Sequence, residues 1–114
     1  MTITEPLYQV GIEHQLAGLC ERLEAEVEHY AELTIECAEA EAQYKREYHR
    51  AILQAANGTV AQKESAAALI AASSFHRWKI AEAQCKSTQQ ALIALRIQIE
   101  STRTISANVR SQGG

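Results

Sequence analysis

The sequence has few residues that interrupt helices and few large aromatic side chains. It contains one proline and five glycines in 114 residues, together with one Trp, one Phe and one Met. Apolar residues still account for 46% of the chain, because alanine is abundant. The remainder is rich in Glu, Gln, Arg and Leu, which lose little rotamer freedom in a helix. The composition therefore predicts long helices with a thin core and excludes a broad globular core.

Segments that direct a chain into a membrane are also missing. No run of about 18 apolar residues occurs, and the first six residues, Met-Thr-Ile-Thr-Glu-Pro, lack the basic and apolar regions of a signal peptide. The three cysteines, Cys20, Cys37 and Cys85, are too far apart in the sequence for a CxxC site, which fits reduced thiols. We therefore expect a cytoplasmic protein that does not bind a membrane.

Motifs for catalysis, metals and nucleotides are absent as well. The glycines form neither a GxGxxG loop nor a phosphate-binding P-loop. The histidines form no HExxH arrangement and lie outside helical reach of a cysteine; they are His14, His29, His49 and His76. We therefore expect exposed histidines, no metal or other cofactor, and no enzymatic activity.

The net charge of −3 conceals a strong charge polarity along the chain. Residues 1–42 hold ten glutamates and one arginine, whereas residues 51–114 hold seven Lys or Arg and three glutamates. Between them, residues 43–50 add three cations and one glutamate. An acidic first half is therefore expected to meet a basic second half.

The hydrophobic pattern predicts an all-α fold of two long antiparallel helices, a helical hairpin or coiled coil. Between Ile12 and Ala51, ten of the twelve positions at heptad spacing suit a core. This predicts a first helix over residues 6–56. Asn57-Gly58 tolerates the left-handed backbone of a helix C-terminus, and Thr59-Val60-Ala61-Gln62 has the form of a capping box, which predicts a turn at 57–59. A turn this short makes the helices antiparallel neighbours.

The second helix is predicted over residues 60–105, within a single domain of residues 1–105. The Ser-, Asn- and Gly-containing end, residues 106–114, is expected to be a flexible tail. The apolar face of this helix is wider than one partner helix can cover, which predicts a homo-oligomer. The expected interface residues are Ile70, Ile80, Leu92, Ile93, Leu95, Ile97 and Ile99.

The hairpin register predicts five ion pairs between the helices, namely Glu13–Arg103, Glu21–Arg96, Glu28–Lys86, Glu36–Lys79 and Glu39–Arg77. In the same register, Cys37 and Cys85 are more than one turn out of alignment. Exposed ion pairs contribute only about 0–1 kcal/mol each, so these pairs are expected to set orientation rather than stability.

Some cations are expected to lack an acidic partner across the hairpin. Lys45, Arg46 and Arg50 face an Ala- and Ser-rich stretch, and Arg103 and Arg110 lead into an end without acids. Unpaired cations are candidates for phosphate contact, although they also suit a solvated face. The aromatic residues, Tyr30, Tyr44, Tyr48, Phe75 and Trp78, could stack on bases, but their position on or beside the helical seam favours core packing.

Three segments carry a resemblance to known proteins: Tyr44-Lys45-Arg46-Glu47, Asn57-Gly58-Thr59-Val60-Ala61, and residues 91–100 followed by Thr102-Arg103. Together they resemble small helical phage proteins that accompany recombination genes, including recombination mediators of the UvsY type. The resemblance implies an oligomer that binds single-stranded DNA and helps a recombinase to displace the single-strand-binding protein. It assigns the DNA contact to Lys45, Arg46 and Arg50.

Two functions are therefore carried forward. The first is a non-enzymatic, oligomeric accessory protein of phage type that binds single-stranded DNA and recombination proteins. The alternative is a protein-binding scaffold, or a phage inhibitor of a host protein, with no nucleic-acid role. Convergence of the basic residues of several subunits on one surface would favour the first.

Overall fold

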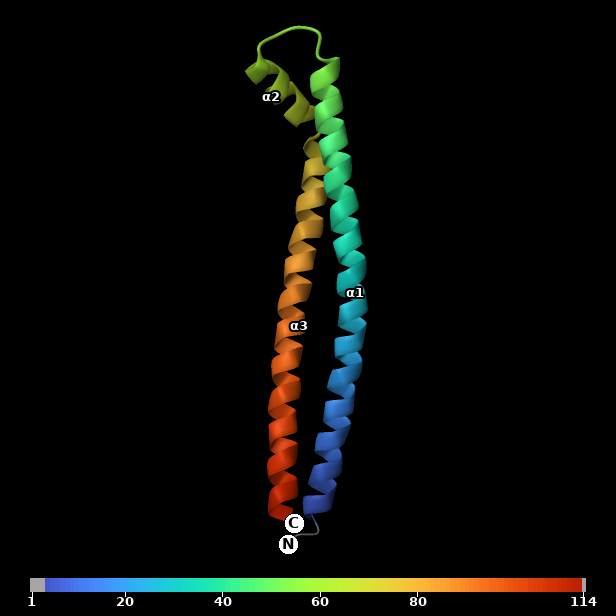
Figure 1. Cartoon of the computed structure of the whole chain (residues 1–114), viewed down its shortest axis with the longest axis vertical. Helices are drawn as coiled ribbons and strands as arrows, with labels where there is room; N and C mark the ends of the chain where they lie inside the picture. Colours follow the sequence, from blue (N-terminus) through green and yellow to red (C-terminus); the bar gives the residue numbers. More distant parts are fainter. Residues whose placement is uncertain (1–3, 114) are drawn as a thin grey trace. The chain divides into compact units, whose positions relative to one another are not determined.

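A computed structural model describes the backbone of residues 4–113 and the side chains of residues 8–112. It contains three helices, α1 (Thr4–Gln54), α2 (Val60–Ile70) and α3 (Ala72–Gly113), and no strand within the described residues (Figure 1). The predicted all-α fold class, with long antiparallel helices, is confirmed. The helices contact one another in two compact units.

Unit 1 consists of residues 1–29 and 88–114, so it pairs the first half of α1 with the second half of α3. Its core is a cluster of buried aliphatic side chains, Leu19, Leu95 and Ile99, with Leu16 and Leu23 packed against them. These residues recur every three or four positions, so each helix presents one apolar stripe to the other. Unit 1 is therefore an antiparallel helix pair with the core that the sequence predicts.

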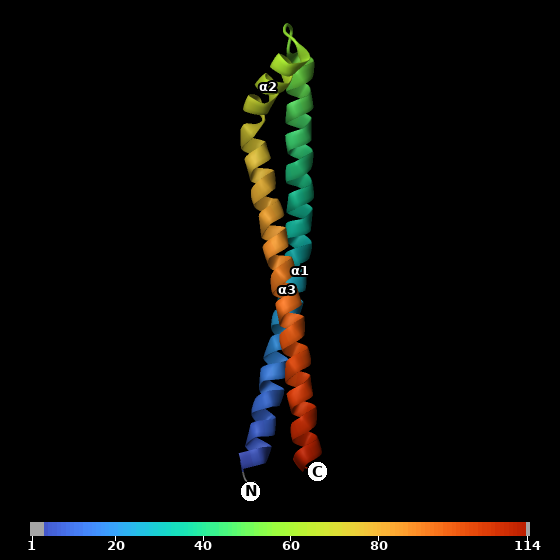
Figure 2. The same ribbon diagram turned by 90° about the vertical axis from the view of Figure 1, so that its left-hand side faces the viewer.

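Unit 2 consists of residues 30–87 and contains the second half of α1, all of α2 and the start of α3. Both views show α2 beside the C-terminal end of α1 (Figures 1 and 2). Apart from Leu33, the buried residues of this unit are small: Ala40, Ala51, Ala67, Ala71, Ser74 and Ala81. Small side chains let helix backbones approach closely, so the buried positions of unit 2 suit close packing of its helices.

The connection between α1 and α2 confirms the predicted turn chemistry. Gly58 has a φ of 117°, a left-handed conformation that a side chain disfavours, and an added Cβ would lie 2.9 Å from Oε1 of Gln62. The backbone N–H of Thr59 donates to Gln62 Oε1 at 3.0 Å, and the N–H of Gln62 donates to Thr59 Oγ1 at 3.2 Å. These two bonds form the predicted capping box at the start of α2.

The single second helix predicted over residues 60–105 is wrong, because the chain forms two helices that separate at Ala71. Ala71 is completely buried, and the Ser74 hydroxyl lies 3.1 Å from its carbonyl oxygen. The same hydroxyl also lies against the Glu47 carboxylate of α1, and its single proton can be donated to only one of these two acceptors. The predicted continuity therefore fails at a position where neither Gly nor Pro marks a break.

The predicted flexible tail is also corrected, because α3 continues to Gly113. Ser106, where the tail was expected to begin, is 4% exposed and accepts a hydrogen bond from Gln9 Nε2 at 3.0 Å. This contact inside unit 1 fixes the last turns of α3 against α1. Residue 114 lies outside the described residues.

The predicted ion pairs are replaced by pairs within single helices. The four predicted pairs that fall inside one unit do not form in the described residues; instead Arg103 bonds to Glu100 at 3.1 Å and Lys79 to Glu82 at 3.5 Å. Arg77, expected opposite Glu39, donates to Gln43 at 2.9 Å. This shift is about one helical turn. Because α2 is a separate segment, the register of α3 cannot be counted from the turn.

Candidate interaction surfaces

The three predicted DNA-contacting cations of unit 2 differ in their surroundings. Lys45 bonds to the carboxylate of Glu41, one turn earlier in α1, at 2.9 Å. Arg46 and Arg50 are exposed and form no ion pair in the part of the chain that the structure describes. The expectation concerned partners across the hairpin, whereas Lys45 is paired along its own helix with a glutamate at the favoured i,i+4 spacing.

The two predicted cations near the C-terminus lie in unit 1, on α3. Arg103 is paired with Glu100, whereas Arg110 is exposed in the last turn of the helix. A cation in the last turn interacts favourably with the negative end of the helix dipole. Each of these residues therefore has a structural explanation that needs no ligand.

Four aromatic rings of unit 2 form one cluster between α1 and α3. The Tyr44 ring lies 5.6 Å from Trp78 in a stacked arrangement, and it packs edge-on against Phe75 at 5.2 Å. Tyr48 packs against Tyr44 at 5.8 Å. The Lys79 ammonium lies 4.2 Å from the Trp78 ring centroid, within range of a cation–π interaction. The rings thus pack on one another at the flank of the two helices, where Phe75 remains 41% exposed.

A polar network connects the same two helices beside the aromatic cluster. The Ser74 hydroxyl and the Gln43 amide both donate to the Glu47 carboxylate, and Arg77 donates to the Gln43 carbonyl. The hydrogen bonds from Ser74 and Gln43 lower the pKa of Glu47, and the nearby Arg46 and Arg50 lower it further. Glu47 is thereby held in its charged form at a position where the heptad pattern requires an apolar residue.

Two cysteines face each other across unit 2, contrary to the predicted misalignment. Cys37 and Cys85 lie close enough that Cys85 contributes to the raised pKa of Cys37, and both side chains are half-buried. Partial burial raises the pKa of Cys37, and Cys85, Glu82 and Glu41 raise it further. The same shift in register that pairs Arg77 with Gln43 brings these thiols together, so the sequence alone gave no signal for it.

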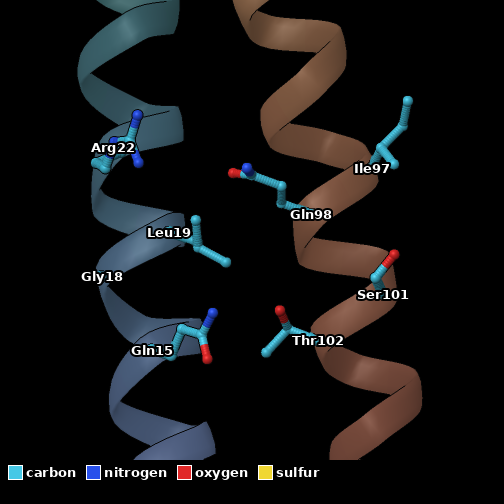
Figure 3. A pocket seen from close by; sticks show the side chains of 8 residues that line it. All are labelled: Gln15, Gly18, Leu19, Arg22, Ile97, Gln98, Ser101 and Thr102. Carbon is cyan, nitrogen blue, oxygen red and sulfur yellow. The ribbon is translucent and has the colours of Figure 1, made fainter.

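A shallow groove runs between the helices of unit 1 (Figure 3). Leu19, Gln98 and Thr102 point toward the opposite helix, whereas Ile97 points away from α1. The remaining lining residues are Gln15, Gly18, Arg22 and Ser101. The lining contains amide and hydroxyl groups and one guanidinium, without a carboxylate, imidazole or thiol. Such a lining suits polar contact with a partner rather than acid–base chemistry.

The predicted oligomer interface separates into two sets. Leu92, Leu95 and Ile99 are buried against α1 and belong to the core of unit 1, which corrects their assignment to an interface. The others remain exposed on their own unit: Ile70 by 66%, Ile80 by 47%, Ile93 by 44% and Ile97 by 62%. Ile93 and Ile97 are one turn apart, with the exposed Ala94 beside them.

Unit 2 has its own exposed aliphatic residues at the end of α1 and on α2. Leu53, Val60 and Leu69 are 85%, 72% and 81% exposed. The heptad pattern did not predict them, because each is a single large aliphatic residue that lies off the seam among polar residues or alanines. In the sequence they could have been found only as Leu or Val at positions that face away from the seam.

Within residues 4–113, no helix has an apolar stretch long enough to cross a bilayer, and no three metal-ligating side chains of the described residues come together. The fold and these surfaces define an all-α protein of antiparallel helix pairs with exposed aliphatic positions. Comparisons with protein-family models, curated proteins and solved structures gave no match.

Proposed function

We propose that this chain is a non-enzymatic accessory protein that works by binding other protein chains, including copies of itself. The observation that supports the proposal most is the exposure of Ile93 and Ile97 on α3, opposite the stripe that already packs on α1. A helix with apolar residues on two faces needs a second partner to cover the second face. Exposed aliphatic patches of this kind usually mark a protein interface.

The mass of the protein in solution at micromolar concentration tests this proposal. We expect a mass above that of the monomer, and we expect Ile93→Glu with Ile97→Glu to lower it while helicity is retained. A matched control replaces an exposed polar residue on another side of the same helix, Ser87→Glu, and should leave the assembly intact. A monomeric parent protein would refute the proposal.

A second candidate is the binding of single-stranded DNA in phage-type recombination, together with a recombinase or a single-strand-binding protein. Arg46 and Arg50 favour it, because they are exposed one turn apart and form no ion pair in the described residues. The Tyr44 and Tyr48 rings are half-buried on the same helix. Two cations per subunit give little affinity alone, so the candidate depends on an oligomer that multiplies them.

Titration of a labelled oligonucleotide at low salt tests the second candidate. If it is correct, the logarithm of the affinity should fall with the logarithm of salt concentration by about 0.7 for each phosphate contact. Arg46→Ala with Arg50→Ala should abolish binding, whereas Lys45→Ala should have less effect because Lys45 is paired with Glu41. No binding at low salt would leave the protein-binding function as the better account.

A further inference from the structure

The solvent-facing side of α1 within unit 2 forms a second regular stripe. Leu33, Ala40 and Ala51 are buried on the inner side of the helix, so residues on the opposite side are exposed. Two large aliphatic side chains are among them, with Ile35 60% and Leu53 85% exposed. We refer to this stripe as the outer face of α1, and its seam consists of Ala31, Ile35, Ala38, Ala42, Lys45, His49 and Leu53.

Charges of opposite sign flank the two ends of the outer face. Glu32, Glu36 and Glu39 accompany its first part, and Arg46 and Arg50 accompany its second part; all five are exposed. None of the five forms an ion pair in the part of the chain that the structure describes. The face therefore has unpaired acidic and basic groups in a fixed order along one helix.

The spacing of these charges is that of a coiled-coil flank. Glu32, Glu39 and Arg46 are seven residues apart and so lie on one side of the seam. The short residues Ala38 and Ala42 occupy the middle of the seam, where small side chains permit close approach of a second helix. The stripe thus combines one large aliphatic residue near each end, a centre of alanines followed by Lys45 and His49, and a charged flank.

We propose that the outer face of α1 binds the same face of a second copy in antiparallel orientation. With a two-fold axis close to Ala42, Glu39 of each copy faces Arg46 of the other. An interface related by a two-fold axis must be self-complementary, which the order of charges satisfies. A parallel arrangement would place glutamate against glutamate and arginine against arginine.

This inference rests on the proposed function, because it requires that copies of the chain associate. It adds a contact surface on α1 to the one on α3, and it gives Arg46 and Arg50 a protein partner instead of a phosphate. A nucleic acid would satisfy the two arginines but would be repelled by Glu36 and Glu39 beside them. A second copy satisfies both signs of charge.

Charge reversal and charge exchange test the pairing. Glu39→Arg and Arg46→Glu, made separately, should each raise the dissociation constant of the assembly about tenfold, since each replaces two attractive pairs by two repulsive ones. The double variant exchanges the charges and should restore association to within about twofold of the parent protein. Sedimentation over a range of concentrations measures all three constants, with helicity monitored by circular dichroism.

The outcomes separate this inference from the proposed function. If the parent is monomeric, both fail. If the parent is oligomeric but the single reversals associate as the parent does, or the double variant does not recover, only the α1 pairing is overturned. If Arg46→Glu removes oligonucleotide binding without weakening the assembly, the DNA candidate replaces the pairing.

Cross-linking tests the position of the axis independently of charge. In a chain with Cys20, Cys37 and Cys85 replaced by Ser, Ala42→Cys should form a disulfide-linked dimer under mild oxidation with oxidised glutathione. The matched variant Ala31→Cys should not, because eleven residues on either side of the axis separate its two copies by about 30 Å. Cross-linking of both variants would indicate parallel helices, and cross-linking of neither would place the contact elsewhere; either result overturns the proposal.

Discussion

The two units are built by the same two long helices but are stabilised in different ways. Unit 1 buries large aliphatic side chains, with Leu95 3% and Ile99 4% exposed. Unit 2 buries alanines, with Ala67 1% and Ala71 0% exposed, and places its large rings and a polar network at the flanks. Unit 1 should therefore be sensitive to removal of volume, and unit 2 should be sensitive to addition of volume.

The largest expected effect follows from removing volume in unit 1. Leu95→Ala should lower the free energy of unfolding by about 2–5 kcal/mol, because it removes buried methyl groups and leaves a cavity between α1 and α3. Urea denaturation followed by circular dichroism at fixed protein concentration measures the loss. Ile97→Ala, on the exposed side of the same helix, is the control and should cost much less at concentrations where the protein is monomeric.

A smaller effect is expected from adding volume in unit 2. Ala71→Leu should cost about 1–3 kcal/mol, because a completely buried alanine at the junction of α2 and α3 leaves no space for three more carbon atoms. Ala66→Leu, on the exposed side of α2, should stay within about 0.5 kcal/mol of the parent. Equal stability of the two variants would show that unit 2 is not closely packed and would remove the contrast between the units.

The features that the sequence predicts well are the local ones. The heptad spacing around Leu19 identified the core of unit 1, and the short segment Asn57–Gln62 identified the left-handed glycine and the capping box. Each of these signals depends on residues within one or two turns of each other, and its stereochemistry is nearly independent of the remainder of the chain. The fold class followed directly from them.

The features that the sequence could not predict depend on packing between helices. The break at Ala71 has no Gly or Pro to mark it, and it arises where Ser74 bonds to Glu47 on another helix. The break displaces the register, which explains why Cys37 meets Cys85 and why Arg77 meets Gln43. Because the register was counted through this junction, every contact predicted between α1 and α3 in unit 2 was displaced.

The sequence identified the candidate site residues, but it did not predict the burial and the partners of each one. The pairing of Lys45 with Glu41 was available from the sequence, because glutamate four residues before lysine is a favourable helix pair. The burial of Leu92, Leu95 and Ile99 follows their heptad spacing, whereas their additional assignment to an oligomer interface came from the width of the apolar face, which does not reveal which side a single partner covers. The structure shows which side of each helix is buried, and only then can Ile93, Ile97 and the outer face of α1 be recognised as exposed.

The smallest expected effect concerns the polar network that only unit 2 contains. Because hydrogen bonds lower the pKa of Glu47 below its usual value of 4.5, the stabilisation from the charged carboxylate is present above that pH. It is lost as the pH falls through the lower pKa of the folded state. The difference in urea midpoint between the parent and Glu47→Gln should therefore be largest near neutral pH and should shrink in acid. Ser74→Ala removes the main cause of the shift, so its acid dependence should move toward that of Glu47→Gln, whereas the exposed neighbour Ser73→Ala serves as the control and should follow the parent. If the midpoint difference between the parent and Glu47→Gln is the same at neutral and acid pH, the Glu47 carboxylate contributes nothing to the stability of unit 2 through its charge.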